Sequence, residues 1–468
     1  MHKSEKKSKK DNDFGDMYHY ISKLERKNTT LSSDNAMLAE KLNSKRYKAI
    51  DFLVDSTYTI LRRPNKKKEL IERNIDVLAN MVPSPELPER KVEKGRVDII
   101  NVNFYDWDGE IIFKGGAERY VYDLACLLKA MKYHPRILQC SNKPFEKKYR
   151  GIEIIGIGRG SKSDMRENSF VFNRYCRNAE LIIASPLELA CEIEGVPTIG
   201  INHGINFDGD WNHYKKGYTT NYDIYMDALK RVKRCVCVDT NFINWTRTID
   251  YKRALKEVFV PNYYDAKQFQ NLKRKKNDGK VVFVYPRRIY NARGADITIK
   301  VFDNVLKKNS DKIIIRFVGQ VDNDEIGEKL HALMKKYPKN VFQLEYEMGE
   351  MHKAYEDADV VLVPTRYCEG TSLSCIEGMI AGAAIITTNV GGLPNLVIDE
   401  YNGKLISPTA NELESVVLDL SNNPEKRERL AKSGQEVARN AFCKELWDKR
   451  WNDIINKTLK VKKNSMVK

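Results

Sequence analysis

The 468-residue sequence lacks any run of about 18 consecutive apolar residues, the length that a membrane-spanning helix needs. Residues 1–11 are rich in lysine but precede no apolar stretch, so we expect no secretory signal there. None of the 9 cysteines forms a CxxC pair, which argues against a disulfide framework or a cysteine zinc site. These absences predict a cytoplasmic chain.

The composition that is present fits a globular protein with more than one core. Hydrophobic residues make up 42% and charged residues 31%, and the length suits two or three domains. The formal net charge of +16 favours anionic partners. Because the surplus is spread along the chain and no recognised nucleic-acid motif accompanies it, we predict no nucleic-acid binding.

Residues 1–95 are predicted to form a helical extension that contains a coiled coil at about 18–45. Apolar residues and asparagines alternate at spacings of three and four, with leucine at every d position and asparagine at two a positions: Ile21, Leu24, Asn28, Leu31, Asn35, Leu38 and Leu42. Asparagine at a favours two parallel strands, so a homodimer is expected. An amphipathic helix packed on the rest of the chain is the alternative.

Two further features of this extension bear on its surroundings. The basic cluster Arg62–Lys68 beside apolar helical faces suits contact with an anionic membrane, so peripheral attachment to the inner face is an alternative to a simply solvated surface. Three prolines lie within residues 82–88, and they predict a linker over 82–95.

Residues 96–262 and 263–440 both alternate near-continuous apolar strands with helical segments. Examples of the expected strands are 97–103 and 181–184 in the first region, and 281–285 and 359–363 in the second. Such strands predict parallel sheets covered by helices on both faces. The fold class is therefore α/β, with two Rossmann-like domains facing a cleft, and residues 441–468 form a final helix that returns to the first domain, followed by a basic tail.

Two acidic residues and a group of arginines mark the second domain. Glu369 lies in a small-residue loop between an expected strand and helix, and Glu377 lies two turns along that helix. A helix N-terminus in this position can bind an anion, and carboxylates accept hydrogen bonds from sugar hydroxyls. Residues 286–294, on the first loop of the same domain, carry three arginines that suit a diphosphate.

In these motifs, residues 97–450 resemble the GT-B glycosyltransferases of family 4. Five short motifs match in chain order: Gly115–Arg119, Asn202–Gly204, Val260–Asp265, Arg288 with Arg293–Gly294, and Glu369–Glu377 followed by Gly391–Gly392. The resemblance implies a retaining, hexosyltransferase-like enzyme. It would move a sugar from a nucleotide-sugar to a glycan or lipid-linked acceptor in cell-surface polysaccharide synthesis. It implies no cofactor and no metal, since the nucleotide-sugar is a substrate.

The resemblance also implies roles for individual residues. Arg288 and Arg293 would hold the diphosphate, Glu369 the donor sugar and Glu377 the ribose, while His203 would line the cleft near the transferred sugar. The other expected donor-binding residues lie in loops or at helix starts: Gly115, Gly116, Gly294, Gly319, Gly370, Thr371, Ser372 and Leu373.

Three features depart from the family pattern. Arg293 stands where lysine is usual, and Thr371-Ser372 replaces the common Phe-Gly, which bears on donor identity. Asp106-Trp107-Asp108 has the form of a metal-binding Asp-x-Asp, but a solvent-exposed loop or contact with an acceptor sugar are the other interpretations.

Two other functions compete with transfer. A coiled-coil interaction scaffold with an inactive glycosyltransferase body is the alternative, and the intact Arg288, Glu369 and Glu377 argue against it. A GT-B phosphorylase would need a lysine for pyridoxal phosphate, and no matching motif is found.

Overall fold

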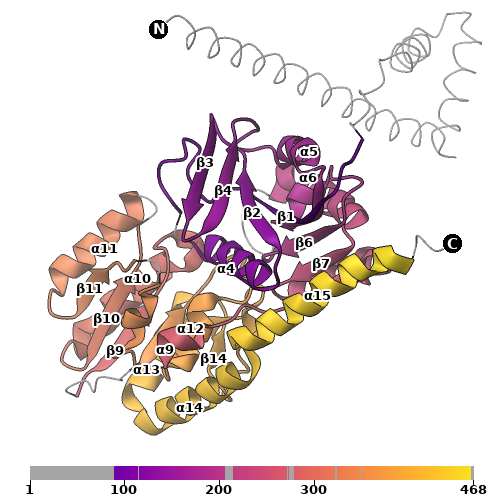
Figure 1. The fold of residues 1–468 in the computed structure, drawn as a ribbon. Coiled ribbons are helices and arrows are strands. Elements are labelled where there is room, and N and C mark those ends of the chain that lie inside the picture. Colours follow the sequence, from indigo (N-terminus) through magenta and orange to yellow (C-terminus); the bar gives the residue numbers. More distant parts are fainter. Residues whose placement is uncertain are drawn as a thin grey trace, which may run out of the picture. The chain divides into compact units, whose positions relative to one another are not determined.

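The computed structural model describes residues 89–464 with gaps at 114, 206–213, 271, 273–278, 322–323 and 348. The coiled coil expected at 18–45, the basic cluster at 62–68 and most of the expected linker lie outside the described residues. Val92–Lys468 form one compact unit with two sheets. Figure 1 shows these sheets in the indigo-to-magenta and orange parts of the chain.

The first sheet has eight strands in the order β3-β4-β2-β1-β5-β6-β7-β8, and every pairing is parallel except that of β3 with β4. Its strands are β1 Glu93–Asn101, β2 His134–Gln139, β3 Pro144–Tyr149, β4 Ile152–Ile157, β5 Ala179–Ser185, β6 Thr198–Asn202, β7 Arg234–Cys237 and β8 Glu257–Phe259. Its helices are α4 Gly116–Ala130, α5 Met165–Tyr175, η1 Leu187–Ala190, α6 Tyr214–Arg231, α7 Thr240–Ile249 and α8 Tyr251–Ala254.

The second sheet has six parallel strands in the order β11-β10-β9-β12-β13-β14. Its strands are β9 Val281–Tyr285, β10 Ile313–Val318, β11 Val341–Leu344, β12 Val360–Val363, β13 Ala384–Thr388 and β14 Lys404–Ile406. The helices that accompany it are α9 Ala266–Phe269, η2 Asn291–Arg293, α10 Ala295–Asn309, α11 Asp324–Lys336, η3 Met351–Tyr355, α12 Leu373–Ile380, η4 Leu393–Asn395, α13 Ala410–Asn422 and α14 Pro424–Ala441.

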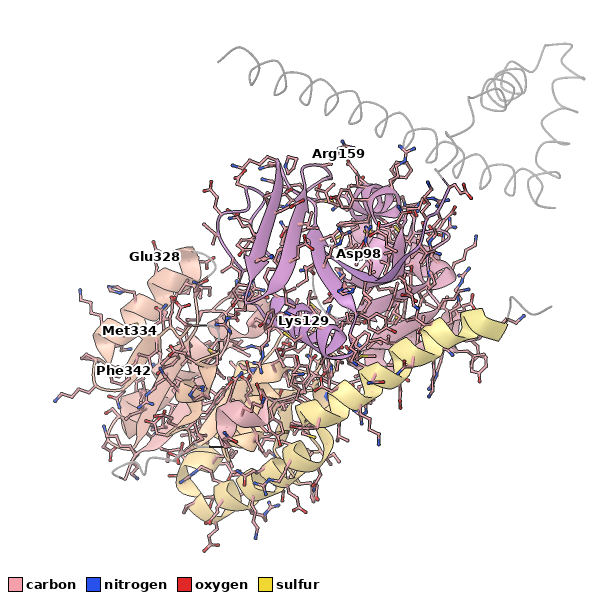
Figure 2. The ribbon with its side chains drawn as sticks, in the orientation of Figure 1. Asp98, Lys129, Arg159, Glu328, Met334 and Phe342 are labelled. Carbon is pink, nitrogen blue, oxygen red and sulfur yellow. The ribbon has the colours of Figure 1, made fainter. Side chains whose placement is uncertain are left out.

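The central strands are buried on both faces because both faces carry helices. All five residues of β9 and of β13 are buried, and so are all four of β12, which explains their continuous Val and Ile content. Figure 2 labels Asp98 on β1, a fully buried carboxylate that pairs with Arg96 at 2.8 Å and Arg136 at 2.9 Å. The two arginines supply the partners that a buried charge requires.

The last helix, α15 Lys444–Asn464, leaves the second domain and packs on the first, as the yellow helix in Figure 1 shows. Trp447 and Trp451 are almost fully buried in the same core as Val97 and Tyr120. The Trp451 indole N–H donates to the Tyr120 hydroxyl at 2.9 Å. The first domain therefore takes part of its core from the far end of the chain.

Candidate active site

Glu369 lies in the loop that joins β12 to α12, and its carboxylate is the centre of a buried charge cluster. It contacts the guanidinium groups of Arg287 and Arg293, and the Thr365 hydroxyl donates to it at 3.0 Å. Burial alone would raise the pKa of Glu369, but the charges of Arg293 and Arg287 outweigh this effect and lower the pKa. Glu369 is therefore ionised at neutral pH.

All three of these contacts fall on one carboxylate oxygen of Glu369, Oε2. The other oxygen, Oε1, takes none of these hydrogen bonds, and the side chain keeps 11% of its surface exposed. The carboxylate is thus held in place by one oxygen and offers the other as an acceptor. This arrangement suits a hydroxyl donor such as a sugar.

Arg287, which the sequence analysis did not select, is the arginine that reaches Glu369 from the loop after β9. Its side chain is 8% exposed, and it also donates to Thr365 at 2.7 Å. Arg288, the expected residue, is exposed, and its guanidinium lies 5.5 Å from the centre of the Tyr290 ring. The alternation of side chains ends with β9 at Tyr285, so the sequence offered no signal for choosing between adjacent arginines.

Arg293, expected to hold the diphosphate, lies beside the Glu369 loop. Besides its ion pair it donates to the Cys368 carbonyl at 3.1 Å. Gly294 follows with φ +81°, and a Cβ there would lie 1.9 Å from the Pro364 carbonyl oxygen. Only glycine therefore lets the arginine loop lie against the Glu369 loop.

Gly319 packs against the backbone of the loop that carries Arg287, and Gly391 packs against the backbone of the loop that carries Glu369. A Cβ on Gly319 would lie 2.5 Å from the Arg287 carbonyl oxygen, and a Cβ on Gly391 would lie 2.1 Å from that of Glu369. Gly391 has φ +55°, and the Gly392 amide donates to the Glu369 carbonyl at 2.8 Å. These glycines fix the backbone positions of Arg287 and Glu369.

Glu377, on α12, has both carboxylate oxygens engaged. Oε1 forms an ion pair with Arg119 of α4, and Oε2 accepts from the Tyr355 hydroxyl at 3.0 Å. Glu377 is 3% exposed, and one guanidinium nitrogen of Arg119, Nη2, is buried without a partner. The pair links the two domains, and local sequence pattern did not reveal this contact of Arg119, the last residue of the Gly115–Arg119 motif.

The N-terminus of α4 brings Gly115 and Gly116 to the α12 side of the site. A Cβ on Gly116 would lie 3.2 Å from the Leu373 side chain, the first residue of α12. Beside Gly115 lies Glu118, whose pKa is raised by burial against the opposing effects of its own and the Gly115 backbone amide and of the Arg288 charge. The start of α4 is thus an anion-binding position that a carboxylate of this chain occupies.

His203 follows β6 and faces the first domain's interior. Its Nε2 lies 2.9 Å from the Ser185 hydroxyl, and its ring meets Tyr120 edge to face at 5.2 Å. Burial lowers the pKa of His203 to about 4, so the imidazole is neutral at pH 7. The next residue, Gly204, has φ +110°, and a Cβ there would lie 3.0 Å from the Gly370 amide nitrogen, which places this turn directly against the Glu369 loop.

Thr371 and Asp239 lie where the two domains contact each other. The Thr371 hydroxyl donates to the Val238 carbonyl at 2.7 Å and accepts from the Asn262 amide at 2.9 Å. Asp239 begins α7 by accepting from the Asn241 and Phe242 amides at 2.8 and 3.3 Å, while its Oδ2 is buried without a partner. Ser372 is the N-cap residue of α12. Thr371 thus holds the domain junction together.

The Asp106-Trp107-Asp108 segment forms a tight turn. Asp106 accepts from the Glu110 and Ile111 amides at 2.6 and 3.1 Å, and Asp108 accepts from the Asn142 side chain at 2.8 Å. Trp107 packs on the first core. Within the described part of the chain no three His, Cys, Asp or Glu side chains are grouped to hold a metal. The same residues include no helix both long and apolar enough to cross a bilayer.

Known sequences that are similar to this chain are glycosyltransferases. Residues 266–437 match the family described as glycosyl transferases group 1. An uncharacterized glycosyltransferase of Methanocaldococcus jannaschii is 39% identical over 350 residues, which cover 69% of this chain and 90% of that protein. A lipopolysaccharide 1,2-N-acetylglucosaminetransferase of Salmonella typhimurium is 26% identical over 40% of this chain and 52% of its own length.

Solved structures share the two-domain fold at low sequence identity. Sucrose-phosphate synthase from Thermosynechococcus elongatus superposes with a TM-score of 0.65 at 16% identity, covering 78% of this chain and 99% of that one. Anabaena HepE in complex with UDP-glucose gives a TM-score of 0.58 at 14% identity, covering 77% and 99%. The expectation of a GT-B fold with two parallel sheets is confirmed, and the chain belongs to the group 1 glycosyl transferases.

Proposed function

We propose that this glycosyltransferase is a retaining, family 4 hexosyltransferase that uses a nucleoside diphosphate sugar. The observation that carries the proposal is the Glu369 carboxylate, ionised by Arg287 and Arg293 and presented beside the N-terminus of α12. The carboxylate supplies acceptors for sugar hydroxyls, and the arginines and the helix end supply positive charge for a diphosphate.

In the proposed reaction the bond between the anomeric carbon and the leaving diphosphate breaks, and the acceptor oxygen bonds to that carbon on the same face. The acceptor's proton passes to the leaving phosphate. Positive charge builds on the sugar, where the Glu369 carboxylate would stabilise it, and negative charge builds on the diphosphate, where the arginines would stabilise it. Each guanidinium carries five N–H donors, so Arg287 and Arg293 can hold Glu369 and still donate to phosphate.

The remaining parts of the proposal concern the donor and the setting of the enzyme. We infer a glycan or lipid-linked acceptor, a role in cell-surface polysaccharide synthesis, a cytoplasmic location and a homodimer through residues 18–45. No cofactor or metal is proposed. HepE was solved with UDP-glucose, which supports a UDP-linked sugar as the first donor to test.

Thermal-shift measurements with UDP, GDP, ADP, CDP, dTDP and their sugars test the donor site. Ligand at a hundredfold excess over its Kd adds about 2.7 kcal/mol to the apparent stability. We expect one nucleotide class to raise the unfolding temperature and the others to leave it unchanged. If no nucleotide or nucleotide-sugar shifts the transition, the proposed donor site is wrong.

The variant Glu369→Gln tests the role of the carboxylate. Gln keeps the shape but removes the charge, so we expect transfer to fall at least about a hundredfold, the usual effect of removing one stabilising group. Glu328→Gln on the exposed face of α11, labelled in Figure 2, is the matched control and should keep full activity. Normal turnover by Glu369→Gln would remove this residue from the proposed mechanism.

A further inference from the structure

Residues 249–259, from the last residue of α7 to the last residue of β8, expose several large apolar side chains. The four large side chains concerned are Ile249 (38% exposed), Tyr251 (63%), Leu255 (65%) and Phe259 (36%). They make up four of the eleven large apolar side chains that the described part of the chain exposes. Clusters of this kind mark interaction sites, whereas single exposed apolar residues need no explanation.

Basic residues alternate with these apolar residues along the same segment. Lys252, Arg253 and Lys256 lie within the same segment. The Lys256 ammonium donates to the carbonyls of Leu229 and Lys230 at 2.8 and 3.3 Å, so the C-terminus of α6 lies beside it.

The positive charges crowd one another. Burial lowers the pKa of Lys256, and the nearby charges of Lys233 and Arg253 lower it further. The Lys256 ammonium therefore lies in a positive electrostatic potential, and a bound anion would reduce the repulsion among these cations.

Acidic residues do little to offset this field. Asp250 begins α8 and lies 3.4 Å from Arg253, so its charge is shared with that arginine. Burial raises the pKa of Glu257 to about 8, and the carboxyl is therefore mostly neutral at pH 7. Six cations remain against these two acids: Lys230, Lys233, Arg247, Lys252, Arg253 and Lys256.

We propose that this α7–β8 surface, residues 247–259 with Lys230 and Lys233, binds peripherally to a bilayer of anionic lipid. A bilayer offers both an apolar phase for Leu255 and Tyr251 and a layer of negative headgroups for the flanking cations. An acidic glycan or a nucleic acid would engage the cations but would leave the apolar side chains in water. The chemistry of the surface therefore favours lipid.

The surface includes the end of α7 that is farther along the chain from the proposed active site. Helix α7 begins next to Asp239, whose Cβ would lie 2.5 Å from a Cβ on Gly392, and its ten residues carry the chain about 15 Å away to Ile249. Membrane contact would therefore be made at the opposite end of α7 from Asp239. The inference does not depend on the identity of the donor or the reaction.

Co-sedimentation of the full chain with vesicles tests the proposal. We compare vesicles of phosphatidylcholine alone with vesicles of equal parts phosphatidylcholine and phosphatidylglycerol. Binding is expected on the mixed vesicles and should weaken at high salt. Failure of the wild-type chain to bind the mixed vesicles, or equal binding to both kinds, would overturn the proposal.

Two variants separate the apolar and electrostatic contributions. The double variant Tyr251→Ser/Leu255→Ser should weaken binding to mixed vesicles about tenfold or more, because it removes the groups that enter the apolar phase. Lys252→Ser should weaken it about fivefold. The matched control is Tyr401→Ser/Ile398→Ser, which removes side chains that are 53% and 65% exposed on the second domain and should bind as the wild type does.

The variants also distinguish insertion into the bilayer from a general attraction of polyanions. If the Tyr251/Leu255 variant binds like the wild type, insertion is refuted, even where Lys252→Ser loses binding, because the surface would then attract polyanions in general. If the Tyr401/Ile398 control loses as much binding as the Tyr251/Leu255 variant, the site is not at α7–β8. Unchanged unfolding temperatures in all three variants show that folding is not responsible.

Discussion

Replacing Arg119 with methionine tests the ion pair that links the two domains. Glu377 is 4% exposed at its side chain and Arg119 is 17% exposed, so the pair is largely removed from water. Removing one partner of a buried pair costs about 3–5 kcal/mol, because the other charge stays buried.

The structure places Arg119→Met at the low end of that range. Glu377 keeps the hydrogen bond from Tyr355, and the substitution also removes the Arg119 Nη2, which has no partner in the described structure. We therefore expect a loss of about 3 kcal/mol in the free energy of unfolding.

Urea unfolding followed by tryptophan fluorescence measures this loss in Arg119→Met, Glu377→Gln and the double variant. The two residues are in contact, so the double variant should lose less than the sum of the single losses, by about 2 kcal/mol. Arg439→Met, at an exposed position of α14, should stay within about 0.5 kcal/mol of the wild type. Additive effects of the two single variants would show that the pair does not link the domains energetically.

Three further predictions follow from the site and the extension. Burial raises the pKa of Asp239 from 3.8 to about 6, so the stability linked to its protonated form is present below pH 3.8 and lost as pH rises through 6. Asp239→Asn should therefore raise the thermal midpoint at pH 8 but not at pH 4, and an equal change at both would contradict this assignment. Gly391→Ala places a methyl group 2.1 Å from the Glu369 carbonyl oxygen and should reduce both activity and stability by displacing the Glu369 loop. Gly279→Ala, also at positive φ but with open space around it, should cost only about 1 kcal/mol from backbone strain, and equal activity losses in the two would refute the clash. Deleting residues 1–46 should change the number of chains per particle, measured by light scattering, from two to one, and an unchanged number of chains would exclude the predicted coiled-coil dimer.

Most of the central strands could be predicted from the sequence, whereas three of the four edge strands in the described sheets could not. The expected strands at 281–285 and 359–363 agree with β9 and β12, because strands buried on both faces need continuous apolar runs. The edge strands that were not predicted are β3, whose exposed Glu146 and Lys148 interrupt any apolar pattern, and the three-residue β8 and β14. Edge strands carry such charges because they face water. The inner strand β7 was not predicted either, because it is only four residues long and begins with Arg234.

In the candidate site, contacts within one domain could be expected from the sequence, whereas a contact between the domains could not. The proximity of Glu369 and Arg293 could be expected because each follows a strand, and the carboxyl ends of parallel strands meet at one edge of a sheet. Arg119 was missed as a partner of Glu377 because the two are separated by 258 residues and belong to different domains. Their contact depends on how the domains face each other, which no local spacing encodes.

The return of α15 to the first domain affects the order in which the protein can fold. Tyr120 and Trp451 are 331 residues apart in the chain, yet they share one core. A ribosome must therefore synthesise the whole second domain before α15 is available to cover the Tyr120 face of α4 in the first domain. Until then that face of α4 stays exposed on the nascent chain, so folding of the first domain should finish after that of the second, despite its earlier synthesis.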